Sequence, residues 1–142
     1  MELTFDALSK NYGKKQALIG FSAELTGGIY GLLGPNGAGK STLMNILTGN
    51  LRQTAGEIRF NGAEIRSLGA AFRGRVGYMP QQQTLYPGFT AERFLLYMAS
   101  LRRMPRARAL ERIDWALGAV GLSDVSGKTI RSLSGGMKQR LL

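Results

Sequence analysis

The chain has 142 residues, of which 44% are hydrophobic and 20% charged, a balance that is typical of one globular domain and excludes an intrinsically disordered chain. Lys and Arg outnumber Asp and Glu by 19 to 9, and the chain has no cysteine, which excludes a disulfide scaffold and a thiolate metal site. The first residues do not resemble a signal peptide, and the longest apolar runs, residues 29–33 and 94–101, are too short to cross a bilayer.

Three strands are expected in the first part of the chain. Residues 3–7 and 21–25 alternate between apolar and polar side chains, which predicts two half-buried strands. Residues 29–33 form an uninterrupted apolar run, which predicts a fully buried parallel strand.

A glycine-rich run follows the third expected strand. Residues 34–42 read Gly-Pro-Asn-Gly-Ala-Gly-Lys-Ser-Thr and fit the pattern G-x-x-x-x-G-K-[ST]. Apolar Leu43, Ile46 and Leu47 come next at helical spacing, so the run lies between a strand and a helix, as a phosphate-binding loop does. The alternative is a glycine-rich turn that happens to precede a lysine, and the strand-loop-helix context argues against it.

The residue types in this run suit a nucleoside triphosphate with Mg²⁺. Glycines let backbone N–H groups approach the phosphates, and the start of the following helix directs its dipole toward them. Lys40 is expected to bind the β- and γ-phosphates, and the Ser41 hydroxyl is expected to ligate Mg²⁺. The expected nucleotide-binding residues of the loop are Gly34, Pro35, Asn36, Gly37, Ala38, Gly39, Lys40, Ser41 and Thr42.

Strand patterns continue to about residue 79. Residues 57–65 predict a β-hairpin with Asn61-Gly62 as its two-residue turn. Residues 75–79 predict a further short strand.

From Thr90 the pattern becomes helical. Thr90 suits the N-cap of a first helix, and Pro105 opens a second helix that is expected to end at Gly121. Residues 133–136 then read Leu-Ser-Gly-Gly, where Ser134 suits an N-cap. Two glycines in a first helical turn cost about 1 kcal/mol each relative to alanine, which favours a helix start that something must approach closely, such as a phosphate. A plain Ser-capped surface helix is the alternative.

Together these residues resemble the nucleotide-binding domain of ATP-binding-cassette (ABC) proteins. Ser134, Gly135 and Gly136 match the family's signature motif. By the same resemblance, Tyr12 falls where the family has the aromatic residue that stacks on adenine. Gln81, the first of three consecutive glutamines, matches the Q-loop glutamine that contacts Mg²⁺ and the attacking water.

The resemblance implies an α/β fold: a P-loop NTPase core of the ABC ATPase type, with an antiparallel β subdomain and a helical insert, incomplete at the C-terminus. It implies that the β subdomain and phosphate-loop core occupy about residues 1–85 and the helical subdomain about residues 86–134. Residues 134–142 would be the start of the signature helix.

Two departures from the family pattern bear on activity. Met137 stands where the signature most often has glutamine. No run of four apolar residues is followed by Asp-Glu, and the chain has no histidine, so the family's Walker B carboxylates and switch histidine are missing. We therefore expect these residues to bind ATP and Mg²⁺ without hydrolysing ATP, although the family consists of ATP hydrolases.

The function that the resemblance implies is the ATP-binding subunit of an ABC transporter, which couples ATP binding and hydrolysis to transport. The implied partners are a second ATP-binding domain, identical or different, and a transmembrane permease subunit that holds the protein on the cytoplasmic face of a membrane. An aromatic group is expected either to receive the permease or to pack locally: Tyr86, Phe89, Phe94 and Tyr97. Two alternatives stay open: a soluble ABC ATPase that acts on ribosomes or DNA, and a truncated remnant without catalysis.

Positive charge is concentrated in one stretch. Between Arg66 and Arg112 there are nine arginines and only two acidic residues, Glu92 and Glu111. Such a stretch attracts nucleic acid, anionic lipid or an acidic partner, but a solvated helix face is the simpler interpretation. The arginines lack interleaved aromatic residues, so nucleic acid is not the expected partner.

Overall fold

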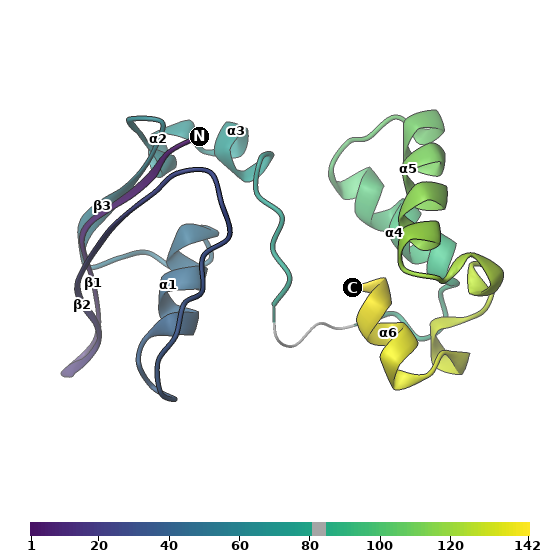
Figure 1. Ribbon diagram of the computed structural model, residues 1–142, viewed down its shortest axis with the longest axis horizontal. Coiled ribbons are helices and arrows are strands. Elements are labelled where there is room, and N and C mark those ends of the chain that lie inside the picture. The colour runs from purple at the N-terminus through teal and green to yellow at the C-terminus, as the bar shows by residue number, and fades with distance from the viewer. Residues whose placement is uncertain (81–84) are drawn as a thin grey trace. The chain divides into compact units, whose positions relative to one another are not determined.

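The computed structural model describes residues 1–80 and 85–142, and the chain divides into two compact units, Met1–Tyr78 and Met79–Leu142. Each unit has its own cluster of buried apolar side chains. Figure 1 shows strands and helices in the first unit and helices in the second. The finer subdivision expected at about residues 85 and 134 stays a prediction.

The first unit is built on a four-stranded antiparallel sheet in the order β2-β1-β3-β4. The strands expected at residues 3–7 and 21–25 are confirmed as parts of longer strands. The hairpin expected at residues 57–65 is confirmed as well, and it turns at Asn61 and Gly62, whose φ angles of 48° and 81° are those of the left-handed turn that Asn-Gly favours. The strands are β1 (Leu3–Tyr12), β2 (Lys15–Leu25), β3 (Ala55–Phe60) and β4 (Ala63–Glu64).

Three helices pack against this sheet: α1 (Lys40–Leu47), α2 (Ile65–Leu68) and α3 (Ala70–Arg73). The helix expected after the glycine-rich run is therefore confirmed as α1. Its Leu43 and Ile46, one turn apart, are buried in the same cluster as Phe5 and Leu8 of β1. Burial of this apolar side fixes α1 on the sheet and leaves its first turn at the surface.

The structure contradicts two of the expected strands. Residues 29–33 form no strand, and Ile29 and Leu33 are exposed over 104% and 92% of their reference areas. Residues 75–79 also form no strand. A parallel strand needs a neighbouring strand to which its backbone can hydrogen-bond. In the described residues, the strands of the sheet, β1 to β4, pair only with one another, so neither segment has such a neighbour.

The side chain of Tyr30, within the expected strand at residues 29–33, forms local hydrogen bonds with Thr26. Its hydroxyl accepts a hydrogen bond from the Thr26 backbone N–H at 3.0 Å and lies 3.3 Å from the Thr26 hydroxyl. The hydrogen bond with the Thr26 side chain is the main cause of a pKa of Tyr30 below its ordinary value, and the hydrogen bond with the Thr26 backbone adds to this effect.

The second unit is helical. Its core buries Phe94 of α4, Ile113 and Leu117 of α5, and Leu141 of α6. Thr90 is confirmed as the N-cap of α4, since its hydroxyl accepts the Arg93 N–H at 3.1 Å. None of the helices in the described ranges is long and apolar enough to cross a membrane. The elements are α4 (Ala91–Leu101), α5 (Arg106–Ala119), the 3₁₀ turns η1 (Ser123–Val125) and η2 (Ile130–Ser132), and α6 (Gly135–Leu141).

Candidate functional site

The glycine-rich loop leads directly into α1 and rests on β2. Gly37 and Gly39 have φ angles of 88° and 85°, which favour glycine. A Cβ on Gly39 would lie 2.4 Å from the carbonyl oxygen of Ala17 in β2, so no other residue fits there without a shift of the backbone. The loop is therefore seated on the sheet through a contact that requires glycine.

The ammonium group of Lys40 lies inside the loop. Its Nζ donates hydrogen bonds to the carbonyl oxygens of Gly34 at 2.5 Å and Pro35 at 2.8 Å. The loop also closes on itself, because the Ala38 N–H donates to the Pro35 carbonyl at 3.2 Å. Lys40 thus brings a positive charge to the concave side of the loop, where a phosphate would be held.

The start of α1 is open to a ligand. Gly39 is the N-cap and forms no side-chain capping hydrogen bond, and the first turn contains no acidic residue. The N–H groups of a first helical turn have no acceptor inside the helix, so this end binds an anion readily. The arrangement therefore fits a phosphate group in charge and in hydrogen-bonding capacity.

The Ser41 side chain is exposed in this first turn. Within the described ranges, no group of three or more His, Cys, Asp or Glu residues is placed to hold a metal ion. A divalent cation beside phosphates bound at this helix start would have the Ser41 hydroxyl as one oxygen ligand, together with phosphate oxygens. This donor set suits Mg²⁺, which takes oxygen ligands and keeps several waters.

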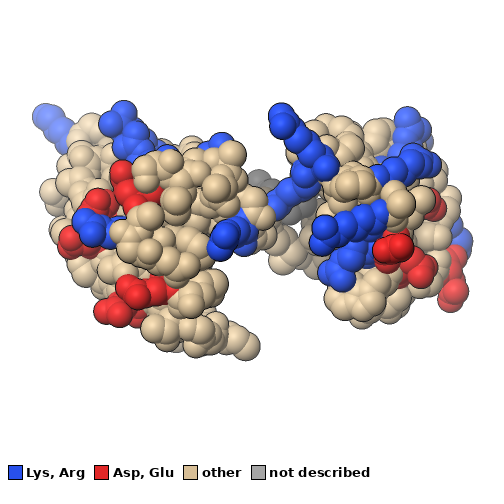
Figure 2. All heavy atoms as spheres, turned by 90° about the horizontal axis from the view of Figure 1, so that it is seen from above, with Lys and Arg blue, Asp and Glu red and all other residues tan. Residues whose placement is uncertain are grey.

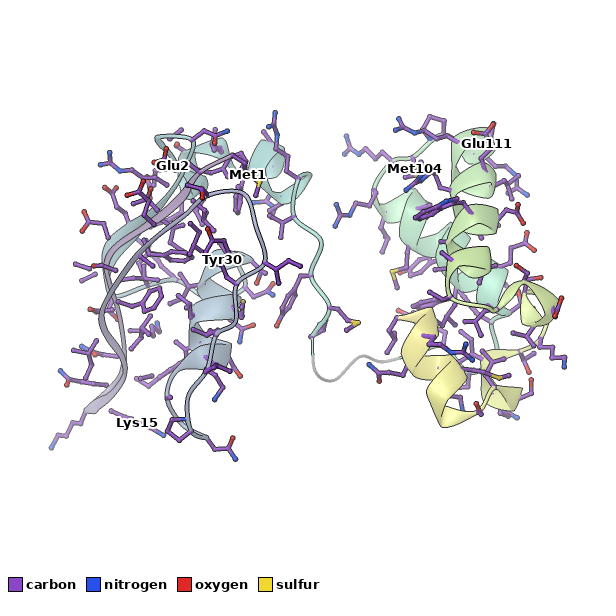
Figure 3. The ribbon with its side chains drawn as sticks, viewed as in Figure 1. Met1, Glu2, Lys15, Tyr30, Met104 and Glu111 are labelled. Carbon is purple, nitrogen blue, oxygen red and sulfur yellow. The ribbon has the colours of Figure 1, made fainter. Side chains whose placement is uncertain are left out.

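Tyr12 lies at the end of β1, half exposed, and pairs with Lys15 of β2. Because Ala17, the residue that contacts Gly39, lies two positions further along β2, the strand brings Tyr12 and the phosphate loop to the same end of the first unit. Lys15 in Figure 3 marks this end of the sheet. A ring stacked on Tyr12 would therefore be near an anion bound at the start of α1.

Sequence reasoning missed one neighbour of Tyr12. The Lys10 ammonium lies 5.2 Å from the centroid of the Tyr12 ring, a cation–π contact. The two residues are two positions apart on β1, and residues two apart lie on the same face of a strand, so this spacing is the signal that could have identified Lys10.

The Leu-Ser-Gly-Gly run lies in the second unit, at the start of α6. The Ser134 hydroxyl accepts the Met137 N–H at 3.2 Å, which confirms Ser134 as an N-cap. Gly135 and Gly136 are exposed. The expected site residues thus fall in two separate units, and Gln81, the expected Q-loop glutamine, lies outside the described residues.

The aromatic group expected near the Q-loop forms a cluster of its own. The centroid of the Tyr86 ring lies 5.1 Å from that of Phe89 and 5.6 Å from that of Tyr97. A hydrogen bond with Tyr86 raises the pKa of Tyr97 above its ordinary value. Phe94 is buried, while Tyr86 and Tyr97 are 42% and 37% exposed, so the cluster joins the core to the surface.

Known proteins match nearly the whole chain. The sequence model of a family described as "ABC transporter" matches residues 19–142. The daunorubicin resistance ATP-binding protein DrrA3 of Streptomyces coeruleorubidus is 37% identical over 140 residues, which cover 98% of this chain and 44% of that protein. The linearmycin resistance ATP-binding protein LnrL of Bacillus subtilis is 36% identical, with 98% and 45% covered.

The fold has a similar match among solved structures. The structure of cbiO1 from Clostridium perfringens, described as part of the ABC transporter complex cbiONQ, superposes with a TM-score of 0.83. It is 28% identical in sequence, and the match covers 98% of this chain and 58% of that one. The chain spans less than half the length of the curated relatives it matches.

Proposed function

The chain belongs to the ABC transporter family, and on that premise we propose that its phosphate loop binds ATP for a transport ATPase. The proposal rests on the position of the Lys40 ammonium group. It lies within the glycine-rich loop at the start of α1, where no side chain caps the helix. A positive charge beside unpaired backbone N–H groups recognises the phosphates of a nucleotide.

Different groups of the loop would bind the phosphates and the Mg²⁺ ion of the nucleotide. The backbone N–H groups of residues 39–41 would donate hydrogen bonds to the phosphates, Lys40 would neutralise charge on the β- and γ-phosphates, and the Ser41 hydroxyl would ligate Mg²⁺. In the family, water attacks the γ-phosphoryl group of Mg²⁺-bound ATP and ADP leaves, and this hydrolysis would drive transport. The remaining loop residues shape the backbone around the phosphates: Gly34, Pro35, Asn36, Gly37, Ala38 and Thr42.

Tyr12 supplies the contact to the base. It is half exposed at the end of the sheet that also seats the loop, and an aromatic ring in that position offers a flat face to adenine. Stacking accepts any base, so Tyr12 contributes affinity more than selectivity.

The second unit serves a partner. We propose that Ser134, Gly135 and Gly136 complete the nucleotide site of a second ATP-binding domain, and that Gln81 approaches Mg²⁺ when the sites close. The aromatic cluster of Tyr86 and its neighbours would receive a permease subunit, which would hold the protein on the cytoplasmic face of a membrane. Exposed rings beside a packed core support this assignment, since such rings are enriched at protein interfaces.

Hydrolysis needs residues that the 142-residue sequence does not supply. The family's Walker B carboxylates and switch histidine have no counterpart in it, since no apolar run precedes Asp-Glu and histidine is absent. We therefore propose that these residues bind ATP without turning it over, while the family as a whole hydrolyses it.

The test is a titration of the chain with a fluorescent ATP analogue in the presence of Mg²⁺. Lys40→Ala removes the charge inside the loop, and we expect the affinity to fall roughly 10- to 100-fold, because a hydrogen bond to a charged group contributes about 1.5–3 kcal/mol.

Lys128→Ala is the matched control, since it removes the same charge from an exposed position in the other unit. Equal affinity of the Lys40→Ala variant and the wild-type chain would contradict the assignment. An equal loss in both variants would show a response to net charge alone and would contradict it as well.

A further inference from the structure

The second unit carries exposed arginines that the nucleotide site does not use. Arg103 lies in the connection between α4 and α5, and Arg106, Arg108 and Arg112 lie on α5; all four are exposed. Within residues 1–80 and 85–142, none of the four forms an ion pair with a carboxylate. Figure 2 shows Lys and Arg gathered on the face of this unit that is seen from above. This charge is therefore available to an external anionic partner.

Two of these arginines share one side of α5 with an exposed tryptophan. Arg108, Arg112 and Trp115 follow at intervals of four and three residues, which places them on the same side of a helix. The guanidinium carbon of Arg112 lies 4.6 Å from the centroid of the Trp115 ring. The buried residues Ala109 and Ile113 face the core of this unit, whereas Arg108, Arg112 and Trp115 are exposed to solvent.

Two large apolar side chains are exposed in the same unit. Trp115 is 62% exposed, and Leu101, directly before the α4–α5 connection, is 63% exposed. Arginines mixed with an exposed indole and leucine are the composition of surfaces that lie at a membrane interface, where tryptophan sits at the level of the headgroups.

We propose that this surface, defined by Leu101, Arg103, Arg108, Arg112 and Trp115 and called here the arginine surface, binds an anionic lipid bilayer. The guanidinium groups contact lipid phosphates, and Trp115 enters the headgroup layer. The proposal goes beyond nucleotide binding and does not depend on it, because every residue of the surface belongs to the second unit and the phosphate loop belongs to the first.

Single-stranded RNA fits the arginine surface less well. Such RNA is held by a row of aromatic rings that stack on successive bases, whereas this surface offers one indole, with Arg112 already against its ring. Leu101 has no role in RNA binding but contributes to insertion into lipid. One acidic residue, Glu111, lies on the same side of α5, three residues after Arg108 and four before Trp115, and lowers the net positive charge there.

The experiment uses the purified chain and two kinds of vesicle, one of phosphatidylcholine alone and one that also contains phosphatidylglycerol. Trp115 is the only tryptophan of the chain, so its fluorescence reports on this surface alone. We expect the emission to shift to shorter wavelength with the anionic vesicles and not with the neutral ones. High salt should reverse the shift, since salt screens the attraction to the lipid.

The decisive comparison is between two double variants measured by co-sedimentation with the anionic vesicles. Arg108→Gln with Arg112→Gln should weaken binding on the order of 30-fold, given the contribution of each arginine near an anionic surface. Arg52→Gln with Arg73→Gln removes the same charge from exposed positions in the first unit and should leave binding unchanged.

Three results would overturn the proposal. The first is no blue shift and no co-sedimentation with anionic vesicles. The second is an equal loss of binding in the two double variants, which would show that net charge alone drives it. The third is binding of a single-stranded RNA oligonucleotide, abolished in the Arg108→Gln, Arg112→Gln variant, by a chain that ignores the vesicles.

Discussion

The starts of α1 and α6 both carry glycines, but for different physical reasons. At α1, Gly39 has a left-handed backbone and so little room that a Cβ would lie 2.4 Å from a carbonyl oxygen. At α6, a Cβ on Gly135 or Gly136 would meet nothing within 4 Å, and neither residue has a positive φ. The fold itself requires glycine at α1, whereas it does not require glycine at α6.

The two helix starts also differ in capping. No side chain caps α1, so its first backbone N–H groups can donate hydrogen bonds to a ligand. In α6, the Ser134 hydroxyl accepts a hydrogen bond from the Met137 N–H. Glycines that cost a helix stability and that the fold does not need leave space for a partner that approaches closely. This difference supports our proposal that α1 binds the chain's own nucleotide and α6 completes a site on a second domain.

The largest expected effect is that of Gly39→Ala. The new methyl group would overlap the Ala17 carbonyl and would hold a left-handed backbone that costs about 1–3 kcal/mol for a residue other than glycine. We expect the free energy of unfolding in urea to fall by about 3 kcal/mol and ATP binding to weaken with it.

Gly31→Ala is the control for this variant, because Gly31 has open space around it and no positive φ. It should change the free energy of unfolding by less than about 0.5 kcal/mol. Identical urea midpoints for the two variants would contradict the close contact between Gly39 and the Ala17 carbonyl of β2.

Gly136→Ala should have a smaller effect of the opposite sign. Alanine is a better helix former and has room here, so we expect the free energy of unfolding to rise by about 0.5–1 kcal/mol. ATP affinity of the single chain should not change, because our proposal gives α6 a role in the site of a second domain and not in the chain's own site. A destabilised variant, measured by the same urea titration, would show that this glycine serves the fold after all.

What could be predicted from the sequence was local. The Asn61-Gly62 turn and the caps at Thr90 and Ser134 depend on residues within a few positions of one another, and the structure confirms all three. The strands expected at residues 29–33 and 75–79 were wrong because a strand depends on neighbours that are distant in sequence.

The candidate site shows the same limit. The order of glycines and lysine predicted a phosphate loop, which stays a prediction. The contact of Gly39 with Ala17 depends on the path of β2, which a local pattern cannot give. The contact of Lys10 with Tyr12 was accessible in principle from strand periodicity. The role of Gln81 stays a prediction.

The measurement that tests the central claim most directly is amide hydrogen exchange of the chain, followed by mass spectrometry, with and without ATP and Mg²⁺. At a protein concentration where the chain is monomeric, we predict slower exchange in peptides that cover residues 34–43 and unchanged exchange in peptides that cover residues 132–142. Unchanged exchange at residues 34–43, or slower exchange at residues 132–142 alone, would contradict the account.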